Sequence, residues 1–252
     1  MYGKHWEEYR LETRDGSSRA ATTADRLSMW LSKHWLALIN VALAIYIGLP
    51  FLAPVLEKTG HPFAAQIIYT TYRALCHELP QRSYFLFGAK PVYSLQELAA
   101  RVGEENLPLY PWPGPFNGNE QVGYKVALCQ RDLAIYGTLL LSGLAFGLVR
   151  SRARPISFWA YVLIGVLPIG LDGGSQLVSY LVPGLFPGGV PRESTWVLRT
   201  ITGAAFGWAT AWLVFPYLQT AFAEIGEKSN ERLFPSPRIE ARPRSPADLR
   251  QP

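Results

Sequence analysis

The chain has 252 residues, of which 49% are hydrophobic, and its charged residues number 24 Lys and Arg against 19 Asp and Glu. The charges are concentrated at both ends of the chain and in a few loops, while long stretches carry none, as is typical of membrane proteins. The basic residues flank apolar runs and do not form a stripe interleaved with aromatics, so the net charge of +5 does not indicate nucleic-acid binding.

The N-terminal segment, residues 1–33, mixes acidic and basic residues in near balance. It has no short apolar core followed by small residues, so it does not resemble a cleavable signal peptide. We therefore expect this segment to stay in the cytoplasm and the apolar run after it to anchor the chain.

Four apolar runs are long enough to cross a bilayer core of about 30 Å, which needs about 20 helical residues. They cover residues 34–56, 133–149, 156–182 and 196–218. In the third run we expect a break at Asp172, Gly173 and Gly174, because glycines weaken a helix and breaks in membrane helices often accompany binding sites.

A long segment, residues 57–132, separates the first two spans. Residues 62–79 have apolar side chains at helical spacing and predict an amphipathic helix that is interfacial or re-entrant rather than a fifth span. Residues 94–102 predict a short polar helix, and residues 107–118 are too rich in Pro and Gly for regular structure. We expect an insertion, residues 90–128, to lie outside the membrane.

Lys and Arg favour the cytoplasmic flanks of membrane spans, and here they gather before residue 34, at residues 150–154 and after residue 227. This bias places both termini in the cytoplasm of a multi-pass cell-membrane protein. The tail, residues 219–252, is rich in Pro, Arg and Ser, and we expect it to be disordered. The predicted fold class is an all-α membrane helix bundle, residues 34–218, in contact with the lipid bilayer.

The predicted topology brings a first polar cluster to the external end: Cys76, His77, Cys129 and Asp132. Thiolate, imidazole and carboxylate groups are the ligands of zinc and related ions, so these residues are candidate ligands for zinc or iron. The two cysteines could equally form a disulfide in an oxidising compartment, or remain free thiols.

A second cluster is expected at the same end of the bundle. Its members are candidate ligand-binding residues: Arg82, Arg131, Asp172, Gln176, Arg192 and Arg199. A carboxylate at membrane depth needs a partner, so Asp172 should face Arg192 or Arg199. The alternative role of the arginines is to hold an anionic small molecule or a lipid headgroup by bidentate hydrogen bonds.

Four ordered motifs resemble a family of prokaryotic membrane proteins known as domain of unknown function 2085. The motifs run from Cys76 to Gly88, from Cys129 to Gly137, from Pro168 to Gln176 and from Arg192 to Gly203. The resemblance implies a membrane protein and no established activity. Family members usually show Cys-x-x-Cys in the second motif, where this chain has Asp132. A Cys-His pair with Cys-x-x-Cys is more typical of a metal or thiol site than of a disulfide, and Asp could replace one thiolate as a ligand, so the resemblance makes the metal interpretation about as strong as the disulfide.

The leading hypothesis is thus an integral membrane protein with an outward-facing polar pocket for a metal ion or a small anionic ligand. One alternative is a membrane enzyme or transporter for a lipid-linked or anionic substrate. Another is a structural subunit that assembles with other membrane proteins. No nucleotide-binding, metalloprotease or hydrolase motif of the common kinds is present.

Overall fold

The computed structural model describes residues 3–76, 79–107, 116–150, 152–182, 184 and 191–234, with side chains from residue 22 onward. The chain forms two compact units, which are described separately. The larger unit is Leu36–Gln219, and the smaller one combines Met1–Trp35 with Thr220–Pro252.

The smaller unit contains the first part of helix α1 (Gly3–Lys58) and the last part of helix α7 (Trp196–Leu233). Trp35 stacks on Phe222 with ring centroids 5.4 Å apart, and Arg232 forms an ion pair with Asp25 at 3.3 Å. The tail predicted to begin at residue 219 therefore starts as helix, and residues 235–252 lie outside the described residues.

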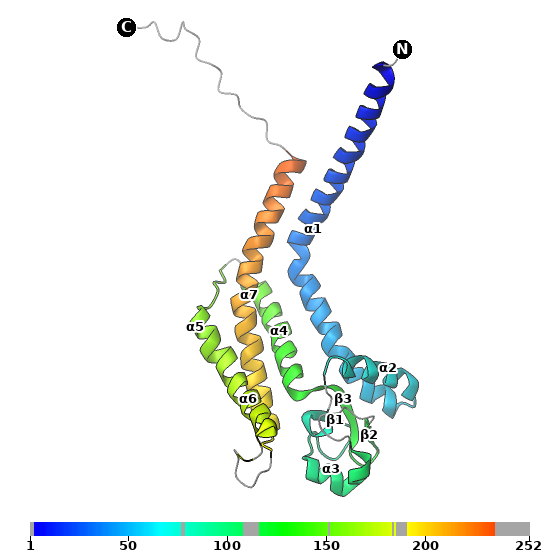
Figure 1. Cartoon of the computed structure of the whole chain (residues 1–252), viewed down its shortest axis with the longest axis vertical. Coiled ribbons are helices and arrows are strands. Elements are labelled where there is room, and N and C mark those ends of the chain that lie inside the picture. The colour runs from blue at the N-terminus through cyan, green and yellow to red at the C-terminus, as the bar shows by residue number, and fades with distance from the viewer. Residues whose placement is uncertain are drawn as a thin grey trace, which may run out of the picture. The chain divides into compact units, whose positions relative to one another are not determined.

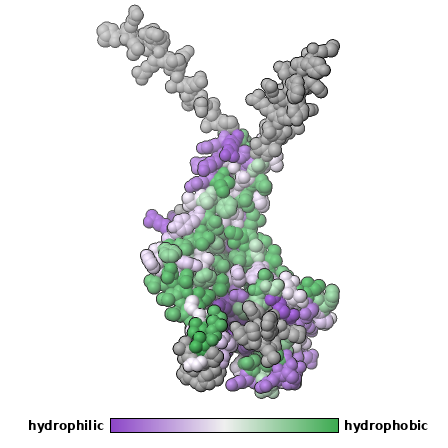
Figure 2. All heavy atoms as spheres, in the orientation of Figure 1, coloured by the Kyte–Doolittle hydropathy of each residue, from purple (hydrophilic) through white to green (hydrophobic). Residues whose placement is uncertain are grey.

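In the part of the chain that the structure describes, four helical segments are long and apolar enough to cross a membrane, which confirms the predicted spans. They are Thr22–Lys58, Gln130–Val149, Phe158–Leu181 and Trp196–Leu233. Large apolar side chains on them remain exposed, such as Leu148 at 90% and Trp159 at 72%. Hydrophobic residues also gather on the surface of the helical part of the larger unit (Figure 2). A wide apolar surface of this kind suits contact with lipid, so the predicted all-α membrane bundle is confirmed.

The break predicted in the third span is wrong. Helix α6 (Leu167–Leu181) passes through Asp172 without interruption, because ionic partners neutralise that carboxylate in place. The irregularity lies earlier, where α5 (Phe158–Tyr161) leads into a π-helical turn, η3 (Val162–Val166). The Leu167 N–H donates to the Val162 carbonyl, five residues back, and Pro168 follows without an N–H of its own.

Helix α4 (Gln130–Val149) packs closely against α1 and α7 through glycines. A Cβ atom at Gly203 would lie 2.7 Å from the Arg131 carbonyl oxygen, and one at Gly207 would overlap the backbone of Ile135. Further along, Gly143 of α4 faces the Asn40 side chain of α1. These approaches set α4 beside α7 (Figure 1), so the first turns of the two helices meet at one end of the bundle.

Residues 62–129, here called the cap, follow α1 and lead into α4, and they contain short strands that the sequence did not predict. The elements of the cap are α2 (Pro62–Arg73), η1 (Pro80–Arg82), β1 (Ser83–Leu86), α3 (Leu95–Val102), η2 (Glu104–Asn106), β2 (Gly118–Asn119) and β3 (Gly123–Cys129). The strands form an antiparallel sheet in the order β1, β3, β2 (Figure 1). The expected insertion therefore contains the central strand of a folded unit.

The core of the cap lies between α2 and β3. The Tyr69 hydroxyl of α2 donates to the Lys125 carbonyl of β3 at 2.6 Å, and Val126 and Leu128 are fully buried. The helix expected over residues 62–79 is therefore correct in type, but its helical part ends at Arg73. The short helix expected over residues 94–102 is confirmed as α3, with a capping box formed by Ser94 and Glu97.

Candidate functional site

Strand β3 leads directly into α4, and this junction positions most of the candidate site. Cys129 ends the strand and caps the helix, because its sulfur accepts the Asp132 N–H at 3.5 Å. Cys129 also pairs with Ser83 across the sheet, and the Gln130 side chain donates to the Ser83 carbonyl at 3.1 Å. Arg82, which precedes Ser83 in the chain, is thereby held beside the cysteine.

Asp172 of α6 is the centre of the first ionic group. Its carboxylate is 2% exposed and accepts hydrogen bonds from Arg131 at 2.5 Å, Ser194 at 2.9 Å and Arg192 at 3.2 Å. Arg192 donates further to the Asp172 carbonyl oxygen at 3.1 Å. This group connects the first turn of α4, the middle of α6 and the segment that precedes α7.

Glu193 is the centre of the second ionic group. Its carboxylate accepts from Arg82 at 2.5 Å, Tyr180 at 2.6 Å and Gln176 at 3.0 Å, and also forms an ion pair with Arg199. Burial raises the pKa of Glu193, but the hydrogen bonds from Arg82 and Tyr180 and the charges of Arg82 and Arg199 outweigh it, so the pKa lies below its usual value. Glu193 is therefore ionised at neutral pH.

These contacts revise the expected pairing. Asp172 does face Arg192, one of its two expected partners, but Arg199 binds Glu193 instead, because Glu193 lies between Arg199 and α6. Arg131 is the additional partner of Asp172. Glu193 and Tyr180 were not among the predicted site residues. The only signal in the sequence was the position of Glu193 within the motif that begins at Arg192.

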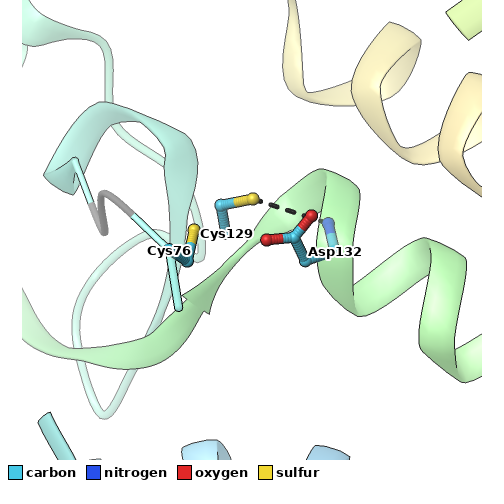
Figure 3. A group of neighbouring side chains, drawn as sticks. All are labelled: Cys76, Cys129 and Asp132. Atoms are coloured by element: carbon cyan, nitrogen blue, oxygen red, sulfur yellow. Dashed lines mark hydrogen bonds between the residues drawn. The ribbon is translucent and has the colours of Figure 1, made fainter. Parts of the chain in front are cut away.

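The cysteine side of the site brings three potential ligands together (Figure 3). The sulfurs of Cys76 and Cys129 and a carboxylate oxygen of Asp132 all lie within 4.8 Å of one another. The structure contains no disulfide between Cys76 and Cys129. A thiol hydrogen bond with Cys76, together with burial, raises the pKa of Cys129 well above its usual value. His77, the fourth predicted ligand, lies outside the described residues.

One cavity of about 230 Å³ unites the two predicted clusters. Its lining includes Cys76, Cys129 and Asp132 from the first cluster, and Arg82, Arg131, Gln176 and Arg199 from the second. Arg131, which lines the cavity, forms an ion pair with Asp172, and Asp172 in turn forms an ion pair with Arg192. The arrangement can hold a cation on its sulfur and carboxylate side and an anion on its guanidinium side.

Residues 121–213 match the family described as a predicted membrane protein, domain of unknown function 2085. The resemblance expected from the motifs is confirmed. The matched region contains every candidate site residue from Cys129 to Arg199, while Cys76 and Arg82 precede it.

The chain is also similar to an uncharacterised protein of Methanocaldococcus jannaschii. The two sequences are 25% identical over 193 residues, which cover 74% of this chain and 93% of the relative. No solved structure matches the chain. The comparisons therefore show that part of the chain is similar to a family of predicted membrane proteins, and the chemistry of the site must be argued from its residues.

Proposed function

We propose that this membrane protein binds a metal ion, zinc or iron, at the outer mouth of its helix bundle. The observation that carries the proposal is the convergence of three potential ligand atoms from different elements, all within 4.8 Å. Cys76 follows α2, Cys129 ends β3 and Asp132 lies in the first turn of α4. Residues brought together by tertiary structure rather than by sequence proximity form a site that exists only in the folded protein.

The donor set fits zinc or iron well. Zinc binds sulfur at about 2.3 Å and carboxylate oxygen at about 2.0–2.2 Å, so the ligand atoms of a tetrahedral site lie roughly 3.3–3.8 Å apart. The three groups would close around an ion by shifts on the order of 1 Å. Metal binding requires thiolates, so it would release protons from both cysteines. His77, which adjoins Cys76 in the chain, is the candidate fourth ligand.

The outward orientation is supported by charge. The site lies at the beginning of α4, whereas the far end of the same helix leads into the basic loop with Arg150, Arg152 and Arg154. Because such loops favour the cytoplasm, the site belongs on the opposite side of the membrane. A disulfide would also suit that compartment, but the two cysteines are not joined in this structure.

Elemental analysis of the purified full-length protein tests the proposal. We expect about one zinc or iron per chain, and a large loss of metal in Cys129→Ser and Asp132→Asn. Asp25→Asn is the matched control, because it makes the same chemical change in the other unit and should leave the metal content unchanged. Metal-free protein with an intact Cys76–Cys129 bond, detected by mass spectrometry before and after reduction, would rule the proposal out.

A further inference from the structure

We infer that the guanidinium side of the same cavity is a binding site for a small oxyanion, a phosphate or carboxylate group, placed next to the metal. The inference rests on the proposed function, because the metal ion would lie next to the oxyanion in the cavity. It adds a second class of ligand, a small oxyanion, that binds in the same cavity. Three properties of the described residues support it: an excess of arginines over carboxylates, unused donors and the size of the cavity.

The first property is charge. The two ionic groups contain four arginines and two carboxylates: Arg82 and Arg199 on Glu193, and Arg131 and Arg192 on Asp172. A third carboxylate, Asp132, lines the same cavity, so the arginines outnumber the carboxylates by one among these described residues. The Arg199 side chain is almost fully buried, and burying a guanidinium group is costly unless its charge is balanced, so an oxyanion in the cavity would add favourable negative charge.

The second property is a set of unused donors on two arginines that line the cavity. The Nε atoms of Arg131 and Arg199 are buried, and neither has a hydrogen-bond partner among the described residues. The Arg199 side chain is only 3% exposed. A guanidinium group has five N–H donors in a fixed plane, and a planar or tetrahedral oxyanion is the acceptor that matches this geometry. Gln176 adds an amide to the same lining.

The third property is size. At about 230 Å³ the cavity is smaller than the roughly 300–1,000 Å³ of pockets for drug-sized ligands. It has room for one small ion with a few waters, each of which occupies about 30 Å³ in the liquid. The same lining contains Cys76, Cys129 and Asp132. An oxyanion there could place one oxygen toward a bound metal and the others toward the arginines.

Binding of inorganic phosphate tests the inference. Isothermal titration calorimetry would use delipidated, zinc-loaded protein in phosphate-free detergent buffer. We expect Arg199→Lys and Arg131→Lys each to weaken phosphate binding at least tenfold, because lysine keeps the charge but loses the fork of donors. Arg152→Lys in the exposed loop is the matched control and should bind as the wild type does. Zinc content should stay the same in all three variants.

A second arm separates the two sources of the oxyanion. If phosphate does not bind, native mass spectrometry of protein before delipidation should show a phospholipid retained by the wild type and lost in Arg131→Lys and Arg199→Lys, which assigns the site to a lipid headgroup. Zinc-loaded protein that binds neither phosphate nor phospholipid overturns the inference and leaves the metal proposal standing. Phosphate binding by protein that holds no metal would support the inference and overturn the metal proposal. If one lysine variant fails to assemble, phosphate binding by the other lysine variant tests the inference.

Discussion

The two sides of the cavity differ in the kind of contacts that hold their side chains. On the arginine side, Asp172 and Glu193 are each held by several hydrogen bonds at 2.5–3.3 Å. On the cysteine side, a thiol hydrogen bond joins Cys76 and Cys129, and the Asp132 N–H donates to the Cys129 sulfur (Figure 3). The arginine side is therefore preorganised by ion pairs within the fold, whereas the cysteine side offers three potential ligand atoms to an ion.

The largest expected effect of a single substitution is at Asp172. Asp172→Asn removes the negative charge between Arg131 and Arg192, and breaking a buried pair from one side costs about 3–5 kcal/mol. The free energy of unfolding, measured by detergent titration, should fall accordingly. In Asp25→Asn the lost partner, Arg232, is 70% exposed, so the change should stay below about 1 kcal/mol. Equal losses in the two variants would show that the arginine side is not preorganised.

The second-largest loss of stability is expected at Gly203, where α4 and α7 meet. A Cβ atom there would lie 2.7 Å from the Arg131 carbonyl oxygen, so Gly203→Ala should force the helices apart and cost about 1–3 kcal/mol. Nothing lies within 4 Å of a Cβ atom at Gly137, so Gly137→Ala should be neutral or slightly stabilising. The comparison is made by thermal unfolding in detergent, and a stable Gly203→Ala variant would argue against this close approach.

The lowered pKa of Glu193 predicts that the stability of the protein depends on pH. Its pKa lies below the usual value of 4.5, since the partners Arg82, Arg199 and Tyr180 favour the ionised form over the effect of burial. The stabilisation it provides is therefore complete above pH 4.5 and is lost as the pH falls through the lowered pKa. Glu193→Gln should lower stability at pH 7 by about 1–3 kcal/mol and flatten the acid limb of the stability profile. An unchanged acid limb in this variant would contradict the assignment.

The smallest effect should come from the cap, away from the cavity. Ser94→Ala removes the capping box of α3 and should cost about 1 kcal/mol. Metal content and phosphate binding should not change, because the cavity lining contains no residue of α3. Hydrogen exchange of the α3 amides measures the local effect. Loss of metal in this variant would mean that the cap and the cysteine side are coupled more tightly than the contacts indicate.

The spans and most of the site were predictable because hydropathy and charge act on whole segments. Apolar runs fixed the four helices, and the clustering of polar residues at one end followed from their order along the chain. The interior of the third span was not predictable in the same way. Whether Asp172 breaks α6 depends on Arg131 and Arg192, which are distant in sequence and become partners only in the fold.

The strands and the role of Glu193 were missed for related reasons. Strand β3 is buried on both faces, including the side chain of Lys125, whose ammonium lies 5.6 Å from the centre of the Tyr69 ring, so its sequence shows no alternation of polar and apolar residues. Glu193 lies in a segment between two spans, where no helical or strand periodicity indicates which arginines it faces.

The most direct test of the shared cavity is X-ray absorption at the metal edge of the purified protein, with and without inorganic phosphate. The account predicts two sulfur scatterers at about 2.3 Å and an oxygen or nitrogen shell at about 2.0–2.2 Å, with the latter shell altered by phosphate in the wild type but not in Arg199→Lys. A metal bound without sulfur, or the absence of any metal from freshly purified protein, would contradict it.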